Sequence, residues 1–547
     1  MKIVLCQINT TVGNYDYNKE KILNYYSNAI SLNADIVVLP ELAITGYPPQ
    51  DLLLENGFVD DNLIVLKEIA AQTTIPMIIG FVRKENGRLY NSAALCQKGK
   101  IIDTYNKILL PTYDVFDEAR YFESGKVAGV WEILISGKKI KVGIQICEDL
   151  WDKRYNTKIS KLQKEKGAEL IINISASPYH EGRIRERQEL IEEKVKAIKI
   201  PFLYCNLIGA QDELIFDGES LALNANCDKI AQGKVFKEDL IIVDIETKSI
   251  KKYPVLENEE KLYRALCLGV KDYFRKTGHS EALIGLSGGI DSALVACIAA
   301  DALGADKVHG VSMPSYFSSE HSKTDAKQLA QNLKINFETI AIQSIVQSFE
   351  TILKTQFEGT VRNVAEENIQ ARTRGNILMA LANKFGWMVL STGNKTEIAL
   401  GYCTLYGDMS GGLSVISDLS KIDVYRISRW INQGAGYNRI PQSTIDKEPS
   451  AELAEDQVDP FDYDIVSPLV DAIIEERKSP HELIEKGADK ELVMRLYRLI
   501  RINEFKRRQA APGLRVSPKA FGLGRRVPIV NHYKGSRFTG GDSGLDI

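Results

Sequence analysis

Residues 285–292 of the 547-residue chain combine the residue types that bind phosphate. Gly288 and Gly289 end a short apolar run, and the apolar stretch 293–303 predicts a helix directly after the loop. Glycine lets the backbone approach a ligand closely, and the free N–H groups of a first helical turn attract phosphate. Asp291 stands where the P-loop of kinases and GTPases has its lysine, which predicts a metal ion beside the phosphates. A structural glycine turn whose serine caps the helix is the alternative.

A second set of reactive side chains lies in the first half of the chain. Glu41 and Cys147 each follow an apolar run, 35–40 and 141–146, and strand ends are where open α/β folds place their chemistry. A thiol attacks an amide only when it is deprotonated, so it needs a base and a positive charge beside it. Glu41 can supply the base and Lys107 the charge. Taken singly, each residue has an ordinary alternative, as a core cysteine, a capping glutamate or a solvated lysine.

Hydrophobic periodicity predicts the elements that must position these residues. In the first half, apolar runs predict strands and an amphipathic stretch at 186–200 predicts a helix, which together indicate a layered α/β domain. Apolar periodicity is lost over 246–254, so we expect a first domain at 1–248 and a second at 256–547. The predicted strands of the first half cover residues 2–7, 35–40, 77–81, 92–97, 141–146, 170–175, 202–206 and 240–244.

Strands and helices alternate in the second half, which implies a doubly wound parallel sheet with ligands at the carboxyl ends of its strands. On its long central helix, Asn368, Arg372 and Gly375 share one face, and Arg374 lies on another side. The predicted elements after the loop 285–292 are the strands 307–313, 336–342 and 387–391 and the helices 322–333 and 366–385, and the helix 257–276 precedes the loop.

These motifs carry two family resemblances. Residues 287–292 match the SGGxDS loop of the ATP pyrophosphatases, which activate a carbonyl oxygen as an adenylate and let ammonia displace AMP. Glu41, Lys107 and Cys147, in this order and with their flanking residues, resemble the catalytic triad of the nitrilase superfamily. The resemblances imply an N-terminal nitrilase-like α-β-β-α sandwich and a C-terminal Rossmann-like ATP pyrophosphatase domain. Glu118 is a candidate second carboxylate near the nucleophile, with a structural ion pair as the alternative.

Both halves together resemble the glutamine-dependent NAD synthetases. In the nitrilase-like glutaminase domain, the resemblance implies that Tyr113, Ser177 and Arg183 bind glutamine, with Arg183 on its α-carboxylate. The motifs that carry this resemblance lie at 40–49, 105–107, 116–122, 146–151, 173–178, 206–218, 368–375, 391–397, 407–408, 418–421, 449–453 and 505–509.

In the synthetase domain, the resemblance implies three groups of contacts. Asn368, Glu397 and Lys506 would contact deamido-NAD. Asp291 and Glu397 would hold Mg²⁺, which takes one or two carboxylates together with phosphate oxygens. The ATP contacts would be Gly285, Leu286, Ser287, Gly288, Gly289, Ile290, Asp291, Ser292, Thr392 and Lys421. The alternative for Lys421 and Lys506 is a solvated lysine. Residues 456–464 lack the family's acidic run that leads to Pro-Pro-Tyr, so we assign no contact to them.

A cysteine amidohydrolase joined to an ammonia-using ligase predicts that glutamine supplies the nitrogen. The resemblance implies ATP-dependent amidation of deamido-NAD to NAD(+), with AMP, pyrophosphate and glutamate as the other products. One alternative is another SGGxDS amidotransferase, such as GMP or asparagine synthetase, although these use different glutaminase domains. A non-catalytic nucleotide sensor predicts the loss of Glu41, Cys147 or Asp291, and all three are present. The last alternative is an enzyme that runs on free ammonia.

Composition and charge limit the classes of partner and the cellular compartment that we expect. A net charge of −3 gives no reason to expect nucleic acid, and no apolar run reaches the roughly 18 residues of a membrane span. The N-terminus lacks the pattern of a signal peptide. The eight cysteines form no CxxC pair and no zinc spacing, which favours a reducing compartment, and we expect the cytoplasm. From the resemblance we also expect a homo-oligomer built on a synthetase-domain dimer. The polar tail 540–547 is predicted to be loosely ordered.

Overall fold

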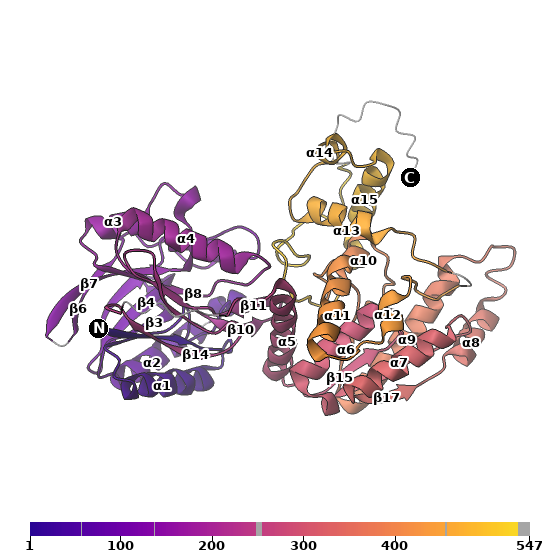
Figure 1. The fold of residues 1–547 in the computed structure, drawn as a ribbon, viewed down its shortest axis with the longest axis horizontal. Coiled ribbons are helices and arrows are strands. Elements are labelled where there is room, and N and C mark those ends of the chain that lie inside the picture. The colour runs from indigo at the N-terminus through magenta and orange to yellow at the C-terminus, as the bar shows by residue number, and fades with distance from the viewer. Residues whose placement is uncertain (56, 136, 248–253, 455–456, 534–547) are drawn as a thin grey trace. The chain divides into compact units, whose positions relative to one another are not determined.

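A computed structural model of the protein describes residues 1–55, 57–135, 137–247, 254–454 and 457–533. The chain divides into two compact units, Met1–Leu256 and Glu257–Ile547, which run from indigo to magenta and from magenta to yellow in Figure 1. Residues 248–253 of the predicted boundary and the predicted loose tail 540–547 lie outside the described residues. Among the described residues, no helix combines the length and the apolar character that a membrane span requires.

Two mixed sheets form the centre of the first unit. Their strand orders are β14-β1-β2-β3-β4-β5 and β13-β12-β9-β8-β7-β6, and a separate hairpin joins β10 to β11. Three adjacent strands are parallel in each sheet, β1 to β3 in the first and β7 to β9 in the second. The strands are β1 Lys2–Gln7, β2 Ile36–Val38, β3 Met77–Glu85, β4 Arg88–Gln97, β5 Lys100–Asn106, β6 Val130–Ile135, β7 Lys138–Ile146, β8 Leu170–Ser175, β9 Phe202–Asn206, β10 Ile208–Gln211, β11 Leu214–Asp217, β12 Leu221–Leu223, β13 Lys229–Gln232 and β14 Asp239–Asp244.

The inner faces of these sheets share one apolar core, and helices cover the outer faces. Side chains of β1 and β2 meet those of β7 and β8 in the core. Helices α1 and α2 pack on the first sheet and α4 packs on the second, so the strands lie between two helical layers in Figure 1. This arrangement confirms the predicted α-β-β-α sandwich. The helices are α1 Tyr15–Ser31, α2 Phe58–Ala71, α3 Ile159–Glu165 and α4 Arg183–Ile198, with the 3-10 helices η1 Gln50–Leu54, η2 Glu118–Arg120, η3 Cys147–Leu150 and η4 Asp152–Arg154.

Several strands of the first unit are longer than predicted or were not predicted. The sequence places strands at 77–81 and 92–97, but β3 and β4 continue toward each other as a hairpin. Its turn residues Asn86 and Gly87 both have positive φ, 51° and 75°, as a two-residue hairpin turn requires. The added positions nearest the turn, Lys84, Glu85 and Arg88, are charged and exposed, so apolar periodicity carries no signal there. Of the strands that the sequence did not predict, β5, β6 and β13 lie at sheet edges, and β10, β11 and β12 span only three or four residues.

A parallel five-stranded sheet forms the centre of the second unit, in the order β17-β16-β15-β18-β19. The strand order reverses beside β15, which pairs with β16 on one side and β18 on the other. Doubly wound sheets bind ligands at such a switch point, outside the carboxyl ends of the strands. The strands are β15 Ala282–Gly285, β16 Val308–Ser312, β17 Asn336–Thr339, β18 Met388–Ser391 and β19 Leu413–Ser414.

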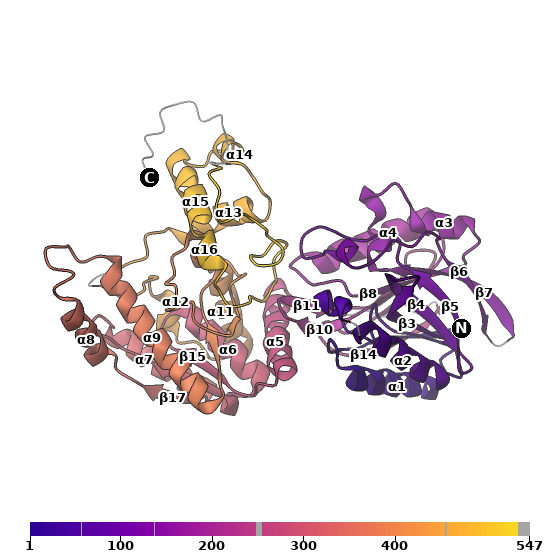
Figure 2. The same cartoon turned by 180° about the vertical axis from the view of Figure 1, so that it is seen from behind.

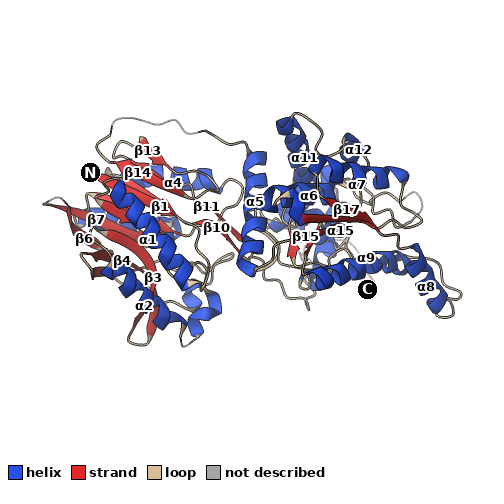
Figure 3. Cartoon of the chain, turned by 90° about the horizontal axis from the view of Figure 1, so that it is seen from below, coloured by secondary structure: helices blue, strands red, loops and turns tan. Residues whose placement is uncertain are grey.

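Helices cover both faces of this sheet, which confirms the predicted doubly wound fold. α8 and α9 share an apolar cluster with β15 and β16, and α6 and α7 pack on the other side of the strands (Figure 3). The later helices α13, α14 and α15 lie together (Figure 2) and share a separate apolar cluster with α10. The helices are α5 Asn258–Thr277, α6 Ile290–Leu303, α7 Glu320–Leu333, α8 Gln343–Leu353, α9 Val364–Phe385, α10 Lys395–Leu400, α11 Lys421–Ala435, α12 Gln442–Asp446, α13 Tyr463–Ile474, α14 Pro480–Glu485, α15 Lys490–Ile502 and α16 Glu504–Arg507, with the 3-10 helix η5 Ala305–Lys307.

Candidate functional sites

In the first unit, strand ends bring Glu41, Lys107 and Cys147 into one buried group. Glu41 follows β2, Lys107 follows β5, and Cys147 begins η3 directly after β7. Their exposed fractions are 0%, 0% and 4%. Cys147 has a φ of +42°, a left-handed conformation that is uncommon for residues with a side chain. Strained backbone of this kind clusters at functional sites, where the surrounding structure holds it in place.

Lys107 joins two carboxylates in this group. Its Nζ donates hydrogen bonds to Oε1 of Glu41 at 2.8 Å and to Oε1 of Glu118 at 2.9 Å. Glu41 also accepts hydrogen bonds from Nδ2 of Asn91 and from the backbone N–H of Ala176, both at 2.7 Å. Glu118, the candidate second carboxylate, therefore lies inside the group as a partner of Lys107. These donors hold the Glu41 carboxylate in one orientation.

Burial sets the protonation of the group. It raises the pKa of the Cys147 thiol well above its usual value, and the charge of Glu41 adds to that rise while Lys107 opposes it. Burial lowers the pKa of Lys107, but Glu118 and Glu41 together raise it well above its usual value. Burial also raises the pKa of Glu118 to about 7, although Lys107 lowers it. The resting group therefore holds a neutral thiol beside a charged lysine, and the thiol needs a base before it can attack.

Asp149 connects the two segments that carry the lysine and the cysteine. Its Oδ1 accepts hydrogen bonds from the backbone N–H groups of Ile108 and Leu109 at 3.1 and 3.0 Å. Its Oδ2 accepts one from the backbone N–H of Ile146 at 3.0 Å. Sequence reasoning missed this residue, since an aspartate next to a glutamate after a strand carries no signal that separates it from a surface acid.

Tyr113, Ser177 and Arg183, the predicted glutamine contacts, also lie in the first unit. The hydroxyl of Tyr113 donates to the Glu148 carboxylate, 2.9 Å from Oε2. Arg183 begins α4, with its guanidinium 3.8 Å above the Trp151 ring. Within the described residues, the buried Oγ of Ser177 and Nε of Arg183 have no hydrogen-bond partner. Buried polar groups are normally paired, so both groups have capacity for a ligand.

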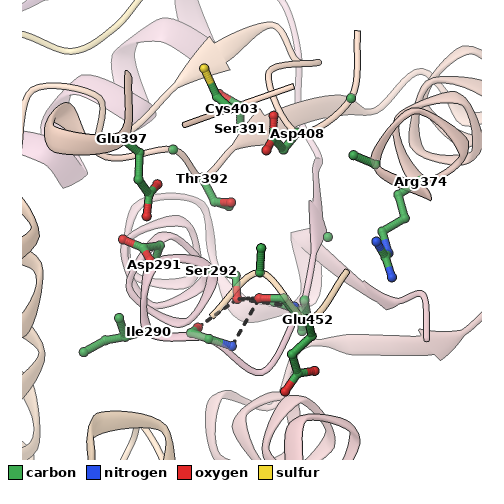
Figure 4. A pocket seen from close by; sticks show the side chains of 18 of the residues that line it. Ile290, Asp291, Ser292, Arg374, Ser391, Thr392, Glu397, Cys403, Asp408 and Glu452 are labelled. Carbon is green, nitrogen blue, oxygen red and sulfur yellow. Dashed lines mark hydrogen bonds between the residues drawn. The ribbon is translucent and has the colours of Figure 1, made fainter. Parts of the chain in front are cut away.

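In the second unit, hydrogen bonds within the loop between β15 and α6 stabilise its conformation. Oγ of Ser287 accepts a hydrogen bond from the backbone N–H of Gly289 at 3.1 Å and lies 3.2 Å from Oγ of Ser292 (Figure 4). Gly288 has a φ of +79°, and a Cβ there would lie 2.3 Å from the carbonyl oxygen of Ser322. Only glycine fits this position, because the conformation and the space both exclude a side chain.

Lys421 joins two carboxylates beside this loop. Its Nζ lies 2.5 Å from Oδ2 of Asp291 and 3.1 Å from Oε1 of Glu397. Nδ2 of Asn394 donates to the other oxygen of Asp291 at 2.9 Å. Burial raises the pKa of Glu397 to about 7, with Lys421 lowering it and Asp291 raising it. Asp291 and Glu397 face each other in Figure 4.

A cavity of about 300 Å³ opens at the carboxyl ends of β15 and β18. Gly288 is not among the lining residues, since its backbone lies against Ser322. The volume suits a small part of a nucleotide, and the lining combines backbone N–H groups with charged side chains, as ligand sites do. The predicted residues that line it are Gly285, Leu286, Ser287, Gly289, Ile290, Asp291, Ser292, Thr392, Glu397 and Lys421.

Asn368 and Lys506 do not line this cavity, but both are hydrogen-bonded to the segment 401–404, which contributes Tyr402 and Cys403 to the lining. Oδ1 of Asn368 accepts a hydrogen bond from the Thr404 hydroxyl at 2.6 Å. Nζ of Lys506 donates to the carbonyl oxygens of Gly401 and Cys403, both at 2.8 Å. The two residues therefore meet the same turn of backbone, 401–404, from two different helices.

Arg374 lines the cavity, although the sequence predicted it on another side of the helix from the candidate contact residue Asn368. The predicted face of α9 packs against backbone, with Nε of Arg372 donating to the Leu405 carbonyl at 3.2 Å. Arg374 instead points into the cavity (Figure 4), held by a hydrogen bond of 2.9 Å from its Nε to the Met313 carbonyl. Burial lowers the pKa of Arg374 to about 10. Helical periodicity separated the two faces, but the fold brings residues of both to the cavity, since Gly375 of the predicted face also lines it.

The segment after α12 also reaches the cavity. Glu452 accepts hydrogen bonds from the hydroxyls of Ser319 and Ser322 at 2.8 and 2.9 Å and from Nζ of Lys447 at 2.5 Å. This ties the segment to the start of α7, beside the phosphate-binding loop. Asp459, from the stretch that departs from the family pattern, lies in the lining as well.

Asp291 and Glu397 fit a hard divalent cation. Within the described residues, no group of three or more His, Cys, Asp or Glu side chains could hold a metal. Two neighbouring carboxylates are nevertheless the donor set with which Mg²⁺ binds a nucleotide, because phosphate oxygens and water supply the remaining ligands.

Comparison with known proteins agrees with the division into two units. The carbon-nitrogen hydrolase family model matches residues 2–255, and the NAD synthase model matches residues 262–510. A glutamine-dependent NAD(+) synthetase of Synechocystis sp. is 43% identical over 98% of this chain and 100% of its own length. One of Thermotoga maritima is 40% identical over 98% and 99%. The structure of glutamine-dependent NAD+ synthetase from Acinetobacter baumannii in complex with ADP is 38% identical, with a TM-score of 0.78 over 97% of this chain and 98% of that one.

The two units therefore define an enzyme that joins a carbon-nitrogen hydrolase to an NAD synthase, which is a ligase. At this identity and coverage, the chain belongs to the glutamine-dependent NAD(+) synthetases. The family assignment separates the chain from the GMP and asparagine synthetases that share the SGGxDS loop.

Proposed function

We propose that the protein amidates deamido-NAD to NAD(+), using ATP to activate the nicotinate carboxylate and glutamine as the source of ammonia. The observation that carries this proposal is that one chain holds two complete groups, each centred on a lysine between two carboxylates. We assign the glutaminase reaction to residues 1–248 and the synthetase reaction to residues 256–547. An enzyme that runs only on free ammonia would have no use for the first group.

In the glutaminase reaction, the Cys147 thiol gives its proton to Glu41 and the thiolate attacks the side-chain amide carbon of glutamine. Lys107 stabilises the oxyanion, since its ammonium is bonded to Glu41 and acts electrostatically on Cys147. Glu41 then gives the proton to the leaving ammonia, and with water it completes hydrolysis of the thioester to glutamate.

Tyr113, Ser177 and Arg183 are the proposed glutamine contacts. The unpartnered Oγ of Ser177 and Nε of Arg183 support this assignment, because a ligand would satisfy both. The guanidinium of Arg183 suits the α-carboxylate of the substrate, as a planar donor pair does.

In the synthetase reaction, the nicotinate carboxylate attacks the α-phosphorus of ATP and pyrophosphate leaves. Ammonia then attacks the carbonyl carbon of the adenylate and AMP leaves. We assign ATP binding to the loop 285–292 with Thr392 and Lys421, and deamido-NAD binding to Asn368, Glu397 and Lys506. Asp291 and Glu397 would hold Mg²⁺, which supplies positive charge to the phosphates when it is bound.

Transfer, assembly and compartment complete the proposal. Free ammonia is mostly protonated at neutral pH, so we expect a sheltered passage from the first site to the second. Exogenous ammonium that competes fully with glutamine at low concentration would argue against such a passage. We also propose a homo-oligomer built on synthetase domains and a cytoplasmic enzyme, the latter supported by its eight free cysteines.

The test is NAD formation from deamido-NAD and ATP, with glutamine or ammonium as nitrogen source, in the intact protein and in Cys147→Ala. The variant should lose glutamine use and keep ammonium use. Cys227→Ala, at a partly exposed cysteine of the same unit, is the control and should keep both. Glutamine use that survives in Cys147→Ala would show that the nucleophile is wrong. An intact protein that makes no NAD from either source would show that the substrate is wrong.

A further inference from the structure

Arg187 is a fully buried arginine with no part in the mechanism above. It lies on α4, one helical turn after Arg183. Its two terminal nitrogens bond the two carboxylate oxygens of Asp217, with Nη1 3.2 Å from Oδ1. Glu219 lies 3.6 Å from the same guanidinium. A buried charge of this kind persists only when it is paired, so Arg187 and Asp217 hold α4 against the end of β11.

Asp217 also connects to the backbone of Ser177. Nδ2 of Asn206, the last residue of β9, donates to Oδ1 of Asp217 at 3.3 Å and to the carbonyl oxygen of Gly218 at 3.0 Å. The other end of the same amide, Oδ1 of Asn206, accepts the backbone N–H of Ser177 at 3.0 Å. A continuous chain of hydrogen bonds therefore runs from Arg187 to Ser177, and every side chain in it is buried.

Ser177, at one end of this chain, and Arg183, one helical turn before the other end, each carry an unsatisfied polar group. Ser177 offers a buried Oγ and Arg183 a buried Nε, neither with a partner in the described part of the chain. Arg183 begins α4 after Gly182, which has a φ of +85° and gives the helix no side-chain cap. Among the buried residues of α4, Arg187 lies nearest to this first turn.

We infer that Arg187 and Asp217 are positioning residues that set the distance between Ser177 and Arg183, and through it the affinity for the amino-acid end of glutamine. This inference rests on the proposed glutaminase function. Neither residue is bonded to Glu41, Lys107 or the thiol, so the pair acts on substrate binding and leaves the chemical step alone. A ligand without an α-carboxylate gains nothing from it.

The first test is glutaminase kinetics of Arg187→Lys in the full-length protein. Lysine keeps the charge but replaces the two-pronged bond to Asp217 with a single one. The KM for glutamine should rise about tenfold, the loss expected from one weakened hydrogen bond to a charged group, with kcat within about twofold. Arg185→Lys is the matched control, because Arg185 is on the same helix, 83% exposed and 3.6 Å from Glu189. It should leave the KM unchanged.

Two thiol reagents give a second readout. At concentrations below saturation, 6-diazo-5-oxo-L-norleucine, which has the amino-acid end of glutamine, should label Cys147 of Arg187→Lys about tenfold more slowly than the intact protein, matching the rise in KM. Iodoacetamide has no α-carboxylate and should label both proteins at the same rate. A purely structural loss would slow both reagents together, and that result would overturn the inference, as would an unchanged KM with a lower kcat.

If Arg187→Lys does not fold, the variant Asp217→Asn tests the same inference. Asparagine retains an Oδ1 acceptor for Asn206, and Glu219 still offers Arg187 a carboxylate. The same rise in KM with unchanged iodoacetamide labelling is expected, and no change in KM would overturn the inference. If the intact protein releases no glutamate from glutamine, the proposed glutaminase function itself fails, and this measurement precedes any variant.

Discussion

Each unit holds a lysine hydrogen-bonded to two carboxylates, but the two groups differ in their access to solvent. Lys107 and its partners Glu41 and Glu118 are 0%, 0% and 7% exposed. Lys421 is 4% exposed, whereas its partners Asp291 and Glu397 are 18% and 16% exposed and line an open cavity. The first group is buried within the protein, and the second faces the cavity to which we assign ATP.

This difference follows the charge of the two substrates. Glutamine presents a neutral amide to its nucleophile, so a buried network of ion pairs can hold the proposed catalytic groups in place before binding. ATP and a dinucleotide bring several negative charges and a cation. In the proposed site, Lys421 would neutralise Asp291 and Glu397 until the nucleotide and its cation bind. Similar residue types thus serve a preorganised site in one unit and an exchangeable one in the other.

The largest effect is expected from Lys107→Met, because it leaves Glu41 and Glu118 buried without a cation. Glutamine-dependent NAD formation should fall by about 10³-fold, and the first unit should lose about 3–5 kcal/mol of unfolding free energy. Ammonium-dependent formation should not change. Calorimetry and steady-state rates with the two nitrogen sources measure these outcomes. Lys100→Met, at an exposed end of β5, is the control. An equal loss with ammonium would contradict the assignment.

Lys421→Met should affect the other unit, and with a smaller loss of stability. NAD formation from both nitrogen sources should fall by about 10²-fold, while glutamine hydrolysis continues. The unfolding free energy should fall less than in Lys107→Met, since Asp291 and Glu397 reach water when their partner is removed. Equal destabilisation by the two substitutions would mean that solvent access does not separate the two groups.

Gly288→Ala tests the phosphate-binding loop. Its positive φ and the carbonyl at 2.3 Å from a new Cβ make the substitution strained, so the affinity for ATP should fall about tenfold. Gly289→Ala is the matched comparison, since Gly289 has a φ of −87° and its nearest atom, Oγ of Ser287, lies at 3.2 Å. It should cost less. Calorimetric titration with ATP measures both, and equal losses would show that the left-handed turn is not the cause.

The smallest effect concerns pH. The pKa of Glu118 rises from 4.5 to about 7 on folding, so between these values the folded protein binds more protons than the unfolded chain. The stability of the first unit should therefore fall as pH rises from 4.5 to about 7. Glu118→Gln should flatten this part of the curve, and Glu123→Gln, at an exposed site, should not. Thermal midpoints against pH measure it. An unchanged slope in Glu118→Gln would show that Glu118 is ionised throughout.

The sequence predicted the two folds better than it predicted the edges of the sheets. Central strands such as β1 and β8 are buried on both faces and read as continuous apolar runs, so periodicity finds them. β5 has exposed residues over most of its length, and its place beside β4 depends on a hairpin rather than on hydrophobicity. Lys107 follows this unpredicted strand, and only its sequence motif pointed to it.

Among the site residues, those in short contiguous motifs could be named from the sequence. Glycine, serine and aspartate in the loop 285–292 carry their chemistry in their types and spacing, because the backbone of one turn brings them together. Asp149, Arg187 and Arg374 could not be identified in this way. Each acts through partners from distant parts of the chain, and a lone charged residue reads as a solvated one.

The sequence by itself thus determined the candidate reactive side chains, the order of the motifs and the fold class of each half. The tertiary structure decided which charged side chains form ion pairs. Glu118 pairs with Lys107, and Asp291 and Glu397 both pair with Lys421. It also decided that Arg374 faces the cavity. The physical reason is that local motifs depend on neighbouring backbone, whereas ion pairs depend on sheet order and helix rotation, which place residues dozens of positions apart within 3 Å of each other.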